Sequence, residues 1–182
     1  MKKIFTSNAL LVGNLVFGQN STLNFDGTDD FVGLGSDVAN RIRSIEFWVS
    51  PNSTINATFS TQALLYRWQG GTATNQDNIG IYFGSSALGD AGKIVFQRNL
   101  GSKVHKITSD ANSWIADTRY HVADVIDPQN CMKIYIDGIK EQSTNGSTAI
   151  AATTSTALHI GSRGSINIRH FDGAIDELRL RK

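Results

Sequence analysis

The sequence predicts an all-β protein, a single antiparallel β-sandwich made of two packed sheets. Apolar residues recur at alternate positions in many short runs, and turn-forming residues separate these runs. The 182 residues include 17 Gly and only 2 Pro, and many Ser, Thr and Asn, a mixture that favours strands and turns over helices. No run has apolar residues at helical spacing, so no helix is available to connect parallel strands.

The bulk composition excludes several classes of protein. The length fits one domain with a substantial core. The formal net charge is +1, from 17 basic and 16 acidic residues, and no basic stripe is visible, which argues against a nucleic-acid partner. Cys131 is the only cysteine, so an intrachain disulfide is excluded.

The first 20 residues, MKKIFTSNALLVGNLVFGQN, have the features of an export signal. Two lysines precede a short apolar run from Ala9 to Phe17, and Gly18 supplies a small residue for cleavage. This run is too short to span a bilayer, so we predict no membrane span. We predict that residues 1–18 are a signal peptide and that residues 19–182 form the domain, which places the protein in the secreted or cell-surface class. A retained N-terminal strand over LLVGNLVF is the alternative, and retention would favour a virion protein.

The predicted strands follow one another along the chain. In the segment 44–50, Ile45, Phe47 and Val49 point to one face and the residues between them to the other. The segment 132–137 alternates in the same way, and Asp137-Gly138 then predicts a tight type I′ hairpin with a return strand at 139–141. The other predicted strands cover 78–83, 93–98, 104–108, 120–126, 157–160 and 175–180.

Two polar segments, 52–61 and 144–156, are predicted as exposed loops. A short edge strand at Ala149-Ile150-Ala151 is the alternative for part of the second segment. About ten strands with one buried face each need two sheets that cover one another. The spacing of these strands therefore favours a sandwich or jelly roll.

Six motifs in a fixed order indicate a family. They are LNFDGTDDFVGLG (23–35), SIEFWVSP (44–51), RYHVADVID (119–127), KIYIDG (133–138), LHIGSRG (158–164) and FDGAIDELRLRK (171–182). In this order and at these spacings the chain resembles the concanavalin A-like, laminin G-like jelly-roll family over residues 23–182. The resemblance implies a jelly roll whose first and last strands lie side by side. It does not fix a function, because this fold serves lectins, glycosidases, adhesins and virion proteins.

Asp26, Gly27 and Asp176 are candidate calcium ligands. The resemblance implies a calcium ion near the first and last strands, and Asp-rich turns supply the oxygen ligands that calcium prefers. Asp176 shares strand parity with Leu178 and Leu180, which predicts an inward-facing carboxylate that needs backbone amides or a cation. The alternative is that these acidic residues cap turns and strand ends without a metal.

A second candidate site would bind carbohydrate. Aromatic rings offer a flat platform for a sugar, and nearby amides and charged groups supply hydrogen bonds. The alternative is that Trp68 only packs at the edge of a sheet. The candidate ligand-binding residues are Tyr66, Arg67, Trp68, Gln76, Asp77 and Asn78.

The sequence contains no recognisable catalytic arrangement. Glycosidases of this fold resemble one another in an ExDxxE or ExDxE strand, which supplies their paired carboxylates; here Glu46 stands alone in its strand. The nucleophile motif GxSxG and the metal motif HExxH are also missing. We therefore predict a non-catalytic extracellular module that binds polysaccharide or glycoprotein and carries a structural calcium. A structural or assembly subunit of a cell surface, appendage or virion is the alternative, and a glycoside hydrolase ranks third.

Overall fold

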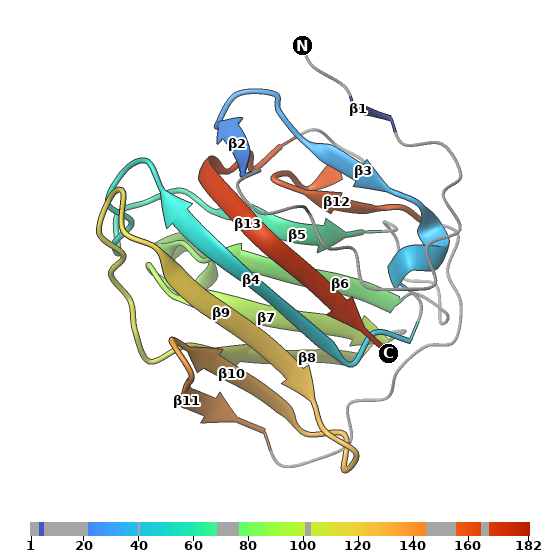
Figure 1. Ribbon diagram of the computed structural model, residues 1–182. Coiled ribbons are helices and arrows are strands. Elements are labelled where there is room, and N and C mark those ends of the chain that lie inside the picture. The colour runs from blue at the N-terminus through green and yellow to red at the C-terminus, as the bar shows by residue number, and fades with distance from the viewer. Residues whose placement is uncertain are drawn as a thin grey trace.

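Two β-sheets pack face to face in the computed structural model (Figure 1). The structure describes residues 4–5, 22–39, 41–68, 77–100, 103–144, 156–164 and 168–182. Within these ranges the regular elements are strands and two short 3₁₀ turns, η1 (Ser36–Ala39) and η2 (Ser86–Leu88). The prediction of an all-β sandwich is confirmed.

The larger sheet has seven strands among the described residues. Its neighbouring strands are antiparallel, except that β1 runs parallel to β3. The order across the sheet is β1 (Ile4–Phe5), β3 (Val32–Leu34), β12 (Leu158–Ile160), β5 (Gln62–Arg67), β6 (Asp77–Phe83), β7 (Ile94–Leu100) and β8 (Lys103–Thr108).

The smaller sheet has six described strands, all antiparallel to their neighbours. The last strand, β13, lies between β4 and β2, and Figure 1 shows it running alongside β4 through the middle of this layer. The first and last strands of this sheet along the chain are thus side by side, as the resemblance implied. The order is β11 (Ile139–Ser143), β10 (Met132–Ile136), β9 (Tyr120–Ile126), β4 (Ser44–Pro51), β13 (Asp172–Arg181) and β2 (Leu23–Asp26).

The predicted hairpin after β10 is confirmed. Asp137 and Gly138 have φ angles of 50° and 79°, the two positive values that a type I′ turn requires, and Ile136 pairs with Ile139 across it. The strand β5 was not among the predicted strands. Its apolar run does not alternate, because a register shift between Ala63 and Leu65 interrupts the pleat.

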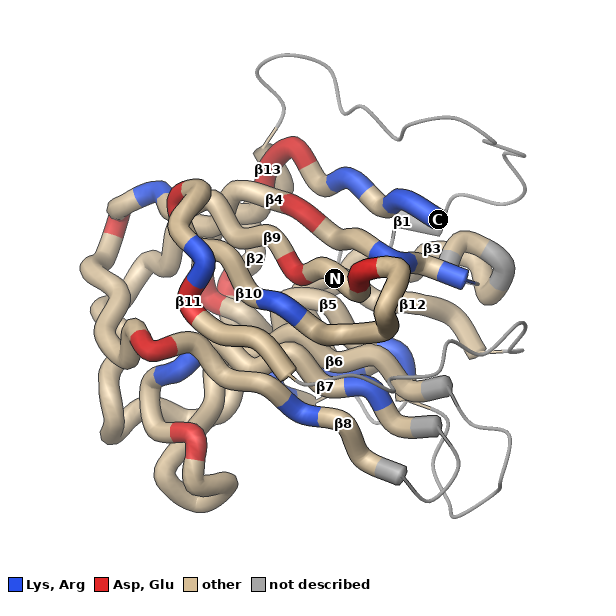
Figure 2. Tube along the Cα trace, turned by 90° about the horizontal axis from the view of Figure 1, so that it is seen from below, with Lys and Arg blue, Asp and Glu red and all other residues tan. Residues whose placement is uncertain are grey.

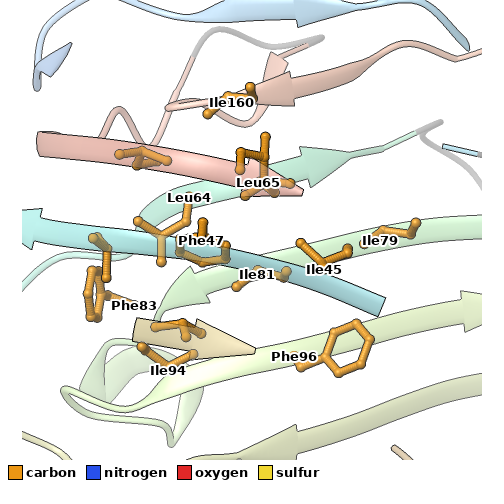
Figure 3. Packing of buried hydrophobic residues seen from close by; sticks show 14 of the residues in the cluster. Ile45, Phe47, Leu64, Leu65, Ile79, Ile81, Phe83, Ile94, Phe96 and Ile160 are labelled. Carbon is orange, nitrogen blue, oxygen red and sulfur yellow. The ribbon is translucent and has the colours of Figure 1, made fainter. Parts of the chain in front are cut away.

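The core lies between the two sheets. Ile45, Phe47 and Val49 of β4 point inward as predicted, and each is at most 1% exposed. Figure 3 shows Ile45 and Phe47 lying close to Ile79 and Ile81 of β6 in the opposite sheet. Each fully buried side chain of this size contributes about 1.5–3 kcal/mol to stability, so this packing holds the two layers face to face.

A bulge in β13 reverses the predicted orientation of Asp176. Ile175 and Leu178 are both buried, at 0% and 1% exposed, although they are three residues apart. The register against β4 shifts between Asp176 and Arg179, and Glu177 adopts a φ of 49° within the shift. Asp176 therefore lies on the outer face of the sheet, and the prediction of an inward-facing carboxylate is wrong.

The segment 52–61 is mostly exposed, as predicted, with one exception. Ile55 is 1% exposed and forms an isolated antiparallel bridge with Trp114, with N–O distances of 2.9 Å in both directions. Trp114 is equally buried and donates a hydrogen bond from its indole nitrogen to Gly92 O at 2.7 Å. The residues 145–155, including the alternative edge strand, lie outside the described residues.

The predicted export signal falls mostly on residues that the structure does not describe. The apolar run from Ala9 to Phe17 is among them, so its role stays a prediction. The described pair Ile4–Phe5 forms β1 beside β3. Within the described ranges, no helix has the length and apolar character needed to cross a membrane.

Candidate functional site

A small aromatic cluster lies on the outer face of the seven-stranded sheet, the face turned away from the other sheet. We call its members, Ala63, Tyr66, Trp68, Tyr82 and Val95, the outer cluster. The ring centroid of Tyr66 lies 6.2 Å from that of Trp68 and 6.1 Å from that of Tyr82. Both tyrosines are buried, whereas Trp68 is partly exposed. Trp68 is therefore the ring of this cluster that a ligand can reach.

Amide side chains extend from the aromatic rings along the same face. Asn78, Gly80 and Tyr82 alternate along β6 with residues of the core, and this alternation turns them outward. Tyr82 Oη donates a hydrogen bond to Gln97 Oε1 at 2.9 Å, and Gln97 Nε2 donates to Asn99 Oδ1 at 2.8 Å. Asn99 pairs in register with Asn78. Three amide groups thus line the face beside the rings.

Arg163 lies over the rings of Trp68 and Tyr66. Its guanidinium carbon is 4.5 Å from the centroid of Trp68 and 5.4 Å from that of Tyr66, within the range of a cation–π interaction. The loop after β12 positions it, because Gly161 N donates to Leu64 O at 2.9 Å and Arg163 N donates to Ile168 O at 3.0 Å. The loop therefore folds back onto the sheet and brings Arg163 to the aromatic cluster.

An ion pair between Lys106 and Asp90 lies on the same outer face. Lys106 Nζ lies 2.9 Å from Asp90 Oδ1 and 3.0 Å from Oδ2. The side chain of Asp90 is only 6% exposed and that of Lys106 is 39% exposed, so the ion pair joins a buried carboxylate to a partly exposed ammonium group. Asp90 belongs to the turn between β6 and β7, which folds back toward the sheet through hydrogen bonds to Ser85 and Lys93.

The two tyrosine hydroxyls remain neutral at physiological pH. Burial raises the pKa of Tyr66 and, more strongly, that of Tyr82. The positive charges of Arg163 and Arg169 act in the opposite direction on both pKa values, but burial is the larger effect. Each phenol therefore keeps its proton and can donate a hydrogen bond.

The structure brings some of the predicted ligand-binding residues together and separates others. Tyr66, Trp68 and Asn78 share the outer face. Arg67 does not, because it pairs with Ile79 of the core and is fully buried on the inner face; we remove it from the candidate set. Gln76 and the side chain of Asp77 lie outside the described residues.

The predicted calcium ligands do not meet. Asp26 pairs in register with Asp172, whereas Asp176 lies further along β13 opposite Trp48. Asp176 Oδ2 accepts a hydrogen bond from Arg119 at 3.2 Å, and its Oδ1 accepts one from Glu177 N at 2.8 Å. Asp176 is therefore engaged elsewhere, and a site that joins it to Asp26 is wrong.

A different set of carboxylates gathers around Asp26. Ligand oxygens of Asp26, Asp29 and Asp30 all lie within 4.8 Å of one another. Asp26 Oδ1 accepts a hydrogen bond from Thr28 N at 2.8 Å, and this bond holds the pKa of Asp26 below its usual value. Gly27 allows the tight turn between these acids, with a φ of 76° that favours glycine.

The sequence interpretation missed Arg163, Gln97 and Asn99. Arg163 lies in the LHIGSRG segment, whose spacing suggested only a family resemblance. The strand β5, which carries Tyr66, and the loop that carries Arg163 are far apart in the sequence, and only the pairing of β12 with β5 joins them. The contact of Arg163 with Tyr66 and Trp68 could be predicted only from that strand order.

The comparisons with known proteins agree with this architecture. A family model described as the concanavalin A-like lectin/glucanases superfamily matches residues 13–182. A search of curated proteins found no match.

Several solved structures have similar folds. One is the Ruminococcus gnavus IT-sialidase CBM40 bound to α2,6-sialyllactose, at 14% identity and a TM-score of 0.58, covering 90% of this chain and 92% of that one. Another is domain 4 of a GH43 extracellular arabinanase from Geobacillus stearothermophilus in complex with arabinotriose, at 20% identity and a TM-score of 0.55, covering 81% and 65%.

Domains LG4-5 of the mouse laminin alpha1 chain are a third example, at 15% identity and a TM-score of 0.57, and the match covers 98% of this chain and 46% of that one. At these identities the likeness to solved structures shows the fold alone. The family match covers most of the sequence and agrees with the two-sheet architecture. This chain therefore belongs to the concanavalin A-like lectin/glucanase superfamily.

Proposed function

We propose that this chain is a non-catalytic carbohydrate-binding module whose ligand lies on the outer face of the seven-stranded sheet. One observation carries the proposal: Trp68 is partly exposed on that face and supported by Tyr66, and the amide of Gln97, also partly exposed, lies on the same face beside the buried amides of Asn78 and Asn99. Sugar rings pack their C–H faces on aromatic rings, and their hydroxyls pair with amides. The likeness to a sialidase module bound to sialyllactose and to an arabinanase domain bound to arabinotriose supports the same class of ligand.

A glycan array with paired variants tests this function. Trp68→Ala removes the exposed ring and should lower binding roughly tenfold or more. Trp48→Ala is the matched control, because Trp48 lies on the outer face of the opposite sheet, where it contacts His121. Equal loss of binding in both variants, or glycan binding that survives Trp68→Ala, would contradict the proposed site. A folded protein that binds no glycan and self-associates would instead support a structural subunit.

We extend the proposal to a structural calcium ion held by Asp26, Asp29 and Asp30. Their clustered carboxylates supply the hard oxygen donors that calcium prefers. Asp26 is ionised at neutral pH, and the hydrogen bond from Thr28 N lowers its pKa further. The ion would fix the turn after β2, at the edge of the six-stranded sheet, and would leave the sugar-binding face unchanged.

Export is part of the same proposal. A carbohydrate-binding module meets polysaccharide or glycoprotein outside the cell, and residues 1–18 have the pattern of a signal peptide. Mass spectrometry of the mature protein tests cleavage after Gly18. Recovery of an intact N-terminus would favour the alternative, a retained N-terminal strand over LLVGNLVF.

A further inference from the structure

Two positive charges beside the outer cluster have no acidic partner among the described residues. Arg163 stacks on Trp68 and Tyr66, and Arg169 is close enough to shift the pKa of both Tyr66 and Tyr82. Neither guanidinium forms an ion pair within the part of the chain that the structure describes. Asp90, whose charge contributes to raising the pKa of Tyr82, is already paired with Lys106.

This arrangement differs from that of the arginines on the opposite sheet. Arg119 also stacks on a tryptophan, with its guanidinium carbon 5.0 Å from the centroid of Trp48, but it pairs with Asp176. Arg179 and Arg181 both pair with Glu46. Figure 2 shows these acidic and basic positions side by side along β4 and β13. On that sheet these three arginines have acidic partners, whereas Arg163 has none among the described residues.

The uncompensated charge has a consequence for the ligand. A guanidinium that stacks on an aromatic ring keeps its in-plane N–H groups for another partner, and these groups match the two oxygens of a carboxylate or sulfate. The Nε atom of Arg163 is buried and has no hydrogen-bond partner among the described residues, and stacking on Trp68 and Tyr66 restricts the guanidinium. Part of the entropic cost of ordering it is therefore met before a ligand arrives.

We infer that the glycan bound at this face is acidic, and that its carboxylate or sulfate group pairs with Arg163 while a sugar ring contacts Trp68. The inference rests on the proposed function, because it names the class of sugar that the same site selects. Arg169 adds to the positive potential and Arg163 makes the direct contact. A neutral oligosaccharide would use only the ring and the amides.

Isothermal titration with paired oligosaccharides separates this inference from the proposed function. Lactose and α2,6-sialyllactose differ by one carboxylate-bearing sugar, and 3′-sulfolactose and trigalacturonate distinguish sulfate and uronic acid as the source of the charge. We expect at least one acidic probe to bind roughly tenfold or more tightly than lactose, with an affinity that falls as salt increases. If lactose binds as well as every acidic probe, the inference fails and the proposed function stands. If none of the four binds and a glycan array is also blank, both fail.

Variants of the arginine complete the test. Arg163→Gln should lower the affinity for the acidic probe roughly 10- to 100-fold, the range of a lost charge-assisted hydrogen bond, and should lower the affinity for a neutral glycan by a much smaller factor. Arg119→Gln is the control, because it removes a stacked arginine from the other sheet. Melting curves establish that both variants fold. A loss of equal size for acidic and neutral probes would overturn the inference, because Arg163 would then only support Trp68.

Discussion

Gly80 lies directly beneath the ring of Tyr66, and a Cβ atom at position 80 would stand 2.9 Å from Tyr66 Cε2. The two residues pair in register on adjacent strands. The missing side chain lets the ring of Tyr66 lie across β6, where it supports Trp68. The geometry of the outer cluster thus depends on one glycine whose backbone is ordinary strand.

Gly80→Ala should move the ring of Tyr66 and weaken glycan binding while the fold is kept. The added methyl group overpacks a tight contact, so we expect a loss of about 1–3 kcal/mol in the free energy of unfolding. Denaturant unfolding measures the stability, and titration with the best array glycan measures the affinity. Gly35→Ala is the control, since a Cβ at that position meets nothing within 4 Å. Unchanged affinity in Gly80→Ala would show that Tyr66 does not set the position of Trp68.

Asp124 is a carboxyl group in the core of the sandwich. It is 0% exposed, and neither oxygen has a hydrogen-bond partner among the described residues. Its neighbours across the sheet are Ile45 and Ile134. Burial raises the pKa of Asp124 well above its usual value, so the folded protein holds this group protonated where the unfolded chain would ionise it.

The stability of the protein should therefore contain a pH-dependent contribution from Asp124. The pKa of Asp124 is higher in the folded protein than in the unfolded chain, where it is about 4. The contribution of Asp124 to the free energy of unfolding is therefore fully present below about pH 4 and is lost as the pH rises toward the folded-state pKa. In that window the loss is about 1.4 kcal/mol per pH unit. Asp124→Asn removes the slope, so its stability relative to the wild type should increase with pH. Urea unfolding between pH 4 and 8 measures this, with exposed Asp117→Asn as control; parallel curves would contradict it.

Asp176→Asn should have a small effect that does not depend on calcium. The ion pair with Arg119 joins a carboxylate side chain that is 17% exposed to a guanidinium side chain that is 55% exposed, and such pairs contribute less than about 1 kcal/mol. The Asn side chain also keeps an acceptor for the N–H of Glu177. Thermal melts with calcium and with EDTA check both statements. A loss of several kcal/mol that calcium modulates would restore Asp176 as a metal ligand.

Calcium should raise the melting temperature, and Asp29→Asn should abolish the increase. An ion bound only by the folded protein stabilises it by about 2.7 kcal/mol when its concentration is 100 times its Kd. Differential scanning fluorimetry with EDTA and with added calcium measures the shift. Asp110→Asn, an exposed acidic site on another loop, should respond like the wild type. If neither EDTA nor calcium changes the melting curve of the wild type, the turn at Asp26 does not bind a structural calcium ion.

Much of the fold follows from the sequence, because alternation is a local property of the chain. The β10–β11 hairpin and the inward face of β4 could be predicted, since each depends on neighbouring residues alone. The face on which Asp176 lies could not be predicted from strand alternation, because the bulge in β13 shifts the alternation between Asp176 and Arg179. The spacing of Ile175 and Leu178 was a usable signal, because two buried residues three apart cannot share one face of a regular strand.

The candidate site was predictable only in part, for a different reason. Tyr66 and Trp68 were identified by their chemistry, but the residues that complete the site come from other strands. Arg67 was included because it lies between them in sequence, although strand alternation sends it to the opposite face. Arg163 reaches Trp68 only through strand order, which no local pattern encodes.

The position of β13 also affects how the protein is made. It is the last of the described strands to leave the ribosome, yet it pairs with both β2 and β4, which are among the first. Until it arrives, those two strands have no partner on their facing edges, and such edges readily pair with other chains. The smaller sheet therefore cannot be completed until β13 has been synthesised, so the domain folds only after nearly all of its strands are present.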